Sequence, residues 1–112
     1  FIAICKVSRA ERNASTEADL CDLDTVTQTQ SVVIPSFRSH CLAMSPDDKQ
    51  LIIGGHIVIR GHTGIIRLLQ MEDFSTQRAL KARDDVLSLA FDPASGVLAC
   101  GHSGGVLELH IP

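Results

Sequence analysis

Two stretches of this chain decide its fold, because they match each other residue for residue. They are LAMSPDDKQLIIG at Leu42–Gly54 and LAFDPASGVLACG at Leu89–Gly101, and every pair of equivalent residues is 47 positions apart. Each stretch has an apolar run, a turn that contains proline, a second apolar run and a glycine. Each is followed by a third apolar run after a further glycine, at Gly64–Leu69 and at Gly105–His110. Internal similarity at a fixed period indicates a repeat architecture.

The repeated runs have the composition of β-strands. They are four to eight residues long, rich in Val, Ile and Leu, and bounded by Gly, Pro, Asp and Ser. The turns at 45–48 and 92–96 combine proline, which presets φ to about −65°, with Asp or Ser, which bonds its own backbone. Between the two copies, Gln77–Ala82 alternates polar and apolar residues, which predicts a half-exposed outer strand. The first repeat is therefore predicted to contain four strands, and the second to lack the fourth.

Four-stranded units at this spacing are typical of β-propeller blades, which are about 40–45 residues long in the commonest type. We expect a complete blade at 40–82, with an extended second turn at 56–63, and an incomplete blade at 83–112. The predicted fold is all-β, a partial β-propeller of about two and a half to three four-stranded antiparallel blades. Closed propellers have about four to eight blades. We therefore expect the remaining blades to come from a longer chain or from other chains.

Residues 1–39 fit the same frame as a further incomplete blade. Apolar runs at Phe1–Val7, Ala18–Asp24 and Ser31–Ile34 predict strands, and the polar segment 8–16 predicts a link between the first two. These strands would be the second, third and fourth of a preceding unit.

Composition and charge argue against several classes of protein. The 112 residues are 45% apolar, which is enough for a packed core, and the net charge is −3. This near-balance argues against a basic nucleic-acid module. No run approaches the roughly 18 apolar residues of a membrane-spanning helix, so no membrane partner is expected. The four cysteines include no C-x-x-C pair, which favours a reduced, intracellular protein.

The segment Leu89–Leu109 resembles the WD-repeat family. The family pattern is an apolar–small–apolar run followed by Ser or Asp and proline, then L-A-x-G, a glycine turn and V-x-L/I-W. Leu42–Leu69 resembles a second copy. The resemblance implies a β-propeller without enzymatic activity that acts as a scaffold for protein–protein interaction, with other proteins as partners and no cofactor.

The chain departs from the family pattern at its polar positions. Leu69–Gln70 and His110–Ile111 stand where the family has its Trp-Asp pair. Gly61–His62 and Gly101–His102 lie in second-turn positions and not before a first strand, so we do not expect them to supply the buried histidine of the family.

A narrower likeness joins Gly64–Asp73 with Asp85–Pro93. These segments resemble the N-terminal propeller of a replisome scaffold family, the chromosome transmission fidelity and minichromosome loss proteins. This resemblance implies a nuclear adaptor in DNA replication or chromosome maintenance, which reaches DNA or chromatin through a larger assembly.

The extension at 56–63 holds the candidate partner contacts. Turns between adjacent strands usually take two to five residues, and this one is longer and more apolar. It either lengthens a hairpin, contacts a partner or is an irregularity of this gene copy, and the sequence leaves these three alternatives open. The candidate contact residues are Ile57, Ile59, Arg60 and His62.

Two further functions are weaker alternatives. The segment 101–105 matches the G-x-S-x-G motif of serine hydrolases around Ser103, but that motif needs a helix after the serine, and a strand is expected here. A nucleic-acid-binding β domain would use two sparse basic runs, but no aromatic residue alternates with them. The basic residues are Lys6, Arg9, Arg12, Arg78, Lys81 and Arg83. No catalytic residue is expected.

No metal site is expected either. His40–Cys41 and Cys100–His102 lack the paired ligands, spaced by two to four residues at both ends, that structural zinc sites usually show. We expect these cysteines to be packed in strands and His56 to be exposed. The paired acids at 47–48 and 84–85 are expected to shape turns.

Overall fold

The computed structural model describes residues 2–10, 13–58, 63–74, 77–82, 84–105 and 107–110, with side chains for 15–58, 63–74, 77–82 and 84–105. Within these residues the chain forms strands and no helix. None of them therefore belongs to a helix long and apolar enough to cross a membrane. The strands are β1 (Ile2–Ala10), β2 (Asn13–Asp22), β3 (Thr27–Ile34), β4 (Phe37–Met44), β5 (Gln50–Ile57), β6 (Thr63–Gln70), β7 (Gln77–Lys81), β8 (Val86–Phe91), β9 (Leu98–His102) and β10 (Leu107–His110).

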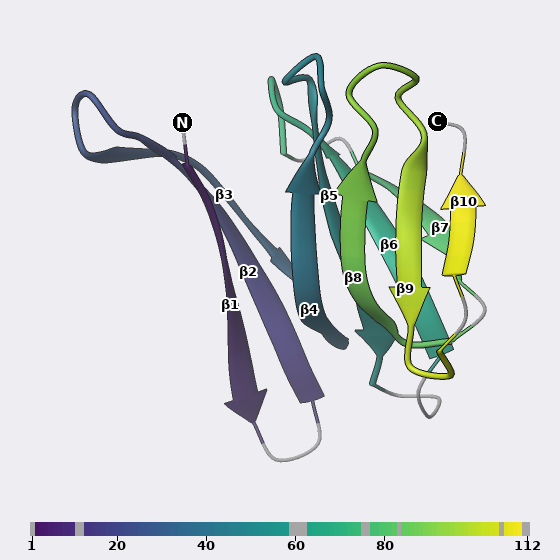
Figure 1. The fold of residues 1–112 in the computed structure, drawn as a ribbon. Coiled ribbons are helices and arrows are strands. Elements are labelled where there is room, and N and C mark those ends of the chain that lie inside the picture. Colours follow the sequence, from purple (N-terminus) through teal and green to yellow (C-terminus); the bar gives the residue numbers. More distant parts are fainter. Residues whose placement is uncertain are drawn as a thin grey trace.

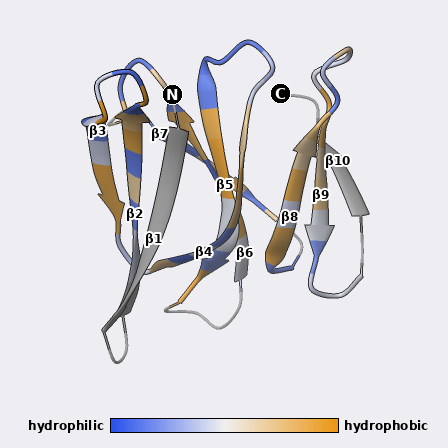
Figure 2. Cartoon of the chain, turned by 60° about the vertical axis from the view of Figure 1, so that its left-hand side comes forward, coloured by the Kyte–Doolittle hydropathy of each residue, from blue (hydrophilic) through white to orange (hydrophobic). Residues whose placement is uncertain are grey.

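The strands form three antiparallel sheets, which confirms the all-β prediction. The first sheet has the order β1-β2-β3, the middle sheet β4-β5-β6-β7 and the third sheet β8-β9-β10. Figures 1 and 2 show the three sheets side by side, with the middle sheet between the other two. The strand β8 packs on β4 and β5, and β2 packs on β4. The two repeated stretches therefore lie in separate sheets.

Two hydrophobic clusters hold the sheets together. The first cluster joins the first and middle sheets and contains Ala18, Leu20, Ile34, Phe37, Leu51, Ile53, Ile65, Leu69 and Phe74. The second cluster joins the middle and third sheets and contains Ile52, Ile66, Leu68, Ala82, Val86, Leu98 and Cys100. Hydrophobic residues lie mainly on the strands in Figure 2.

The two central strands of the middle sheet, β5 and β6, are buried on both faces. Along β5, Leu51 and Ile53 belong to the first cluster and Ile52 to the second. Along β6, Ile65 belongs to the first cluster and Ile66 to the second. Successive side chains of a strand point to opposite faces, so a strand that is covered on both sides needs apolar residues at consecutive positions. This explains the uninterrupted apolar runs in the sequence.

The hairpins β4–β5 and β8–β9 have the same register. In each, one residue of the first strand is unpaired and forms a β-bulge, His40 in β4 and Leu87 in β8, and these two residues are 47 positions apart. The pairs that flank the bulges are Ser39–Gly55 and Cys41–Gly54 in the first hairpin, and Val86–His102 and Ser88–Gly101 in the second. The turns agree as well. The hydrogen bond from Ser45 N to Gln50 O and the one from Asp92 N to Val97 O are both 2.9 Å long.

The prediction for the N-terminal segment was wrong at the polar link. Residues expected to link two strands at 8–16 are mostly paired, since β1 continues to Ala10 and β2 begins at Asn13. An antiparallel pair is held by backbone hydrogen bonds that polar residues form as well as apolar ones. Hydrophobicity alone therefore underestimates the length of this hairpin.

Candidate functional site

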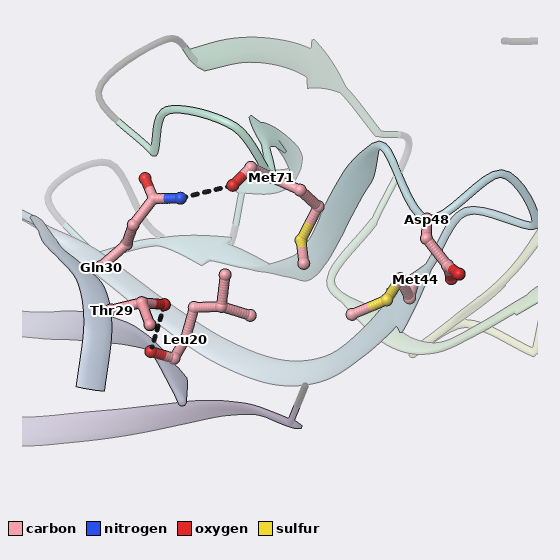
Figure 3. A pocket seen from close by; sticks show the side chains of 6 residues that line it. All are labelled: Leu20, Thr29, Gln30, Met44, Asp48 and Met71. Carbon is pink, nitrogen blue, oxygen red and sulfur yellow. Dashed lines mark hydrogen bonds between the residues drawn. The ribbon is translucent and has the colours of Figure 1, made fainter. Parts of the chain in front are cut away.

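Each pair of neighbouring sheets leaves a hollow at the same edge. The first hollow, about 500 Å³, lies between the first and middle sheets, and the second, about 390 Å³, lies between the middle and third sheets. Met44 lines the first and Phe91 the second, and these residues are 47 positions apart, as are Asp48 and Ser95. The repeat therefore places a cavity beside equivalent turns. The lining of the first hollow is Leu20, Thr29, Gln30, Met44, Asp48 and Met71 (Figure 3).

The first hollow is lined by both apolar and polar side chains, and two of the polar ones bond the backbone. Gln30 donates from Nε2 to the Met71 carbonyl oxygen and accepts at Oε1 from Phe74 N at 2.7 Å. Thr29 Oγ1 donates to Leu20 O at 3.1 Å (Figure 3). The two methionine side chains are unbranched and polarisable, so they adapt to different apolar groups. This arrangement fits the binding of an apolar side chain between the two methionines.

A second candidate site lies where the middle sheet meets the connection from β7 to β8. His40, His56 and Asp85 converge there, and we refer to these three residues as the His–Asp cluster. His40 Nε2 is 3.1 Å from His56 Nδ1, and Asp85 Oδ2 is 3.0 Å from each of these nitrogens. The two rings are tilted by 33°, with centroids 5.1 Å apart. The side chains are 27% exposed for His40, 13% for Asp85 and 8% for His56.

Local backbone structure positions each member of the cluster. His40 is the bulged residue of β4, and His56 pairs with Arg38 next to that bulge. The carbonyl oxygen of Asp85 accepts a hydrogen bond of 2.9 Å from Ser103 N in the turn after β9. The cluster therefore depends on contacts among β4, β5 and the segments that flank β8 and β9.

The predictions for three polar residues, His56, His102 and Asp85, differ from the structure. His56 was expected to be exposed, but it is only 6% exposed because β5 continues to Ile57 and carries it into the middle sheet. His102 was expected in a turn, but it ends β9, is 4% exposed and has its Nδ1 3.2 Å from Asp84 O. The expectation that Asp85 only shapes a turn misses its contacts with the two histidines.

Two of the three cysteines whose side chains are described, Cys41 and Cys100, belong to the second cluster or pack against it. Cys100 is fully buried in the second cluster, and Cys21 and Cys41 carry free thiols. Cys41 Sγ lies 3.8 Å from Gly54 O and 3.7 Å from Val86 O. Burial raises the pKa of the Cys41 thiol to about 11. The bond to Gly54 opposes this shift and the negative charge of Asp85 adds to it. Cys41 is therefore protonated at neutral pH.

The candidate partner contacts are only partly described. Ile57 pairs with Thr63 and packs against the first cluster, so the extension lengthens the β5–β6 hairpin. Ile59, Arg60 and His62 lie outside the described residues.

The structure places Ser103 and Asp47 in turns, and Asp92 begins another turn. Ser103 is exposed, and the strand β10 follows it where a hydrolase would need a helix. Asp47 accepts hydrogen bonds from Ser45 Oγ at 2.6 Å and Lys49 N at 3.0 Å. These bonds hold the pKa of Asp47 below its usual range, and the Ser95 hydroxyl and Ala94 N do the same for the pKa of Asp92. These carboxylates stabilise turns, as predicted.

The basic residues do not form a described patch. Arg78 and Lys81 are exposed on β7, whereas Arg83 and the side chains of the N-terminal basic residues lie outside the described residues.

No family model matches the chain, and no curated protein matches it. Its function therefore has to be inferred from its own geometry.

Proposed function

We propose that this chain is part of a β-propeller of the WD-repeat type that acts as a scaffold for protein–protein interaction. The observation that carries the proposal is that the interface between the first and middle sheets is made by the same positions as the interface between the middle and third sheets. Three equivalent pairs are 48 residues apart in the sequence: Ala18 with Ile66, Leu20 with Leu68, and Ile34 with Ala82. Two further pairs are 47 residues apart: Leu51 with Leu98, and Ile53 with Cys100. In each pair the first residue lies in the first cluster and the second residue in the second cluster.

This equivalence relates the strands as well as the side chains. A shift of 48 residues along the sequence aligns β2 with β6 and β3 with β7. The first sheet therefore corresponds to the second, third and fourth strands of the middle sheet. A shift of 47 residues aligns β4 with β8 and β5 with β9. Each sheet thus contacts the next through one repeated arrangement.

A contact that repeats head to tail produces either a closed ring or an open filament. When the repeated unit is a four-stranded antiparallel sheet packed face to face with its neighbours, the closed form is a β-propeller. A closed ring has about four to eight blades. The three described sheets are fewer, so the proposal requires further blades.

The hollows support the interaction role. The sheets hold the turn at 45–48 beside the first hollow, where Leu20, Met44 and Met71 offer an apolar surface that suits recognition of a protruding apolar side chain. Binding energy at protein interfaces is concentrated in such buried anchors. We propose that other proteins bind at the first hollow through a side chain that inserts between Met44 and Met71.

Direct binding of a purified partner, first identified by affinity capture, tests this proposal. Met71→Glu would place a charge in the first hollow, so we expect at least about tenfold weaker binding, which corresponds to about 1.4 kcal/mol. Val26→Glu is the matched control, because Val26 is 87% exposed in the turn between β2 and β3. Equal affinity of both variants would contradict binding at this hollow.

Two assays address the alternative functions. Hydrolysis of generic esters that is lost in Ser103→Ala would support the hydrolase and contradict a non-enzymatic scaffold. Fluorescence anisotropy with labelled DNA over a salt series would reveal a nucleic-acid binder, because phosphate contacts weaken as salt rises.

A further inference from the structure

We propose that His40, His56 and Asp85 form a binding site for a divalent metal ion of the zinc class, with two imidazole nitrogens and one carboxylate oxygen as protein ligands. The ion would join the middle sheet to the connection that leads into β8. This site is independent of the proposed scaffold function, because it requires only the local packing of β4, β5 and that connection.

The three candidate ligand atoms already form a triangle of nearly the size that a tetrahedral ion requires. His40 Nε2, His56 Nδ1 and Asp85 Oδ2 are separated by 3.0 to 3.1 Å. Bonds of about 2.0–2.1 Å to zinc at tetrahedral angles separate two ligand atoms by roughly 3.3 Å. Each pair therefore needs to open by only a few tenths of an ångström. Imidazole and carboxylate are also ligand types that zinc accepts in proteins.

Hydrogen bonds can account for at most two sides of this triangle. A ring nitrogen either carries a proton and donates or lacks one and accepts, and an ionised carboxylate oxygen only accepts. Three mutually contacting atoms of two kinds always include one pair of the same kind. In every protonation state of the rings, at least one of the three contacts therefore joins two donors or two acceptors and is not a hydrogen bond. A metal ion would engage all three atoms at once, because each of them can offer it a lone pair.

The surroundings of the His–Asp cluster also favour a cation. The second carboxylate oxygen, Asp85 Oδ1, is buried and has no hydrogen-bond partner among the described residues. A positive ion beside this carboxylate would offset the cost of burying it. The side chain of His40 is 27% exposed, which gives an ion access from solvent. The fourth coordination position would then be open to water, as in zinc sites with three protein ligands.

The neighbouring thiol is not part of the converging set. Cys41 follows His40 in the chain, but its Sγ lies near the carbonyl oxygens of Gly54 and Val86. The ligand atoms that lie within 4.8 Å of one another are those of the two histidines and Asp85. Replacement of Cys41 therefore provides a matched control for binding by a thiolate.

Calorimetric titration of the purified chain with Zn²⁺, with Co²⁺ as a spectroscopic probe, tests the proposal. We expect one ion per chain and the visible absorption of tetrahedral Co²⁺ without a thiolate charge-transfer band. His40→Gln should weaken binding by more than about 100-fold, because loss of an outer-shell partner alone costs about 10–100-fold. Asp85→Asn should do the same, whereas Cys41→Ser should bind like the unaltered chain.

Several results would overturn the proposal. They are the absence of saturable one-to-one binding, unchanged affinity in His40→Gln, and loss of binding in Cys41→Ser when the histidine variants still bind.

A measurement on the unaltered chain keeps the test valid if a variant fails to fold. One equivalent of Zn²⁺ should protect His40 from modification by diethylpyrocarbonate and raise the midpoint of thermal unfolding, because a ligand that binds only the folded state stabilises it. Equal modification of His40 with and without the ion would reject the site.

Discussion

Gly54 in β5 lies beneath two side chains from neighbouring strands. A Cβ at this position would be 2.5 Å from Val86 Cγ1 and 2.8 Å from Cys41 Sγ. Gly101 is the equivalent residue of β9, and there a Cβ would meet the Ser88 hydroxyl. At both positions the residue that follows the bulge turns its side chain over the glycine, so the absence of a side chain is a packing requirement.

We predict that Gly54→Ala destabilises the protein by roughly 1–3 kcal/mol, the usual cost of an extra methyl group in a tightly packed site. Chemical denaturation measures this change. Gly104→Ala is the control, since its Cβ would meet only the end of the Asp84 side chain, at 3.1 Å. Equal stability of the two variants would show that the sheets do not approach as closely as described.

At the scale of the elements, the middle sheet differs from an ordinary antiparallel sheet. Such a sheet commonly has one solvated face, but β5 is buried at six consecutive positions, 51–56. Its burial on both sides explains how two cores form from one strand.

This double burial predicts that adjacent residues of β5 are equally sensitive to truncation. Ile52→Ala and Ile53→Ala should each cost about 2–5 kcal/mol, because the two side chains fill different clusters. Val33→Ala should change the stability by at most about 0.5 kcal/mol, since Val33 is 57% exposed. Urea denaturation of the three variants distinguishes this arrangement from a sheet with one solvated face, in which only one of the two isoleucines would matter.

At the scale of the whole molecule, the repeated interface determines what the chain exposes. Ile52 of the middle sheet contacts the third sheet, and its equivalent in the third sheet, 47 residues later, is Ala99, which is half-buried. The exposed residues also include Leu87 of β8, which is 48% exposed. The third sheet therefore has a face that corresponds to a packed face of the middle sheet.

We predict that the 112-residue chain associates with itself in solution when other blades are absent, because this face and the unpaired strand edges are available for pairing. Sedimentation velocity over a range of protein concentrations measures the association. A monodisperse monomer that unfolds in one cooperative transition would contradict this prediction.

Much of the fold could be predicted from local patterns. The match between Leu42–Gly54 and Leu89–Gly101 located two hairpins that have the same register, and the proline turns located their ends. The N-terminal hairpin was underestimated because Ser8 and its partner Ser15 are polar and still pair in register within the strands.

The His–Asp cluster could not be predicted in this way. His56 is 16 residues from His40 and 29 from Asp85, and no motif links them. Only the bulge at His40 and the packing of the β7–β8 connection bring the three side chains together.

The sequence by itself determined the strands, their turns and the repeat, because these depend on short-range patterns of side-chain size, polarity and backbone preference. The tertiary structure alone decided which faces are buried and which distant polar groups meet. The physical reason is that pairing register and sheet packing set distances between residues that local preferences do not constrain.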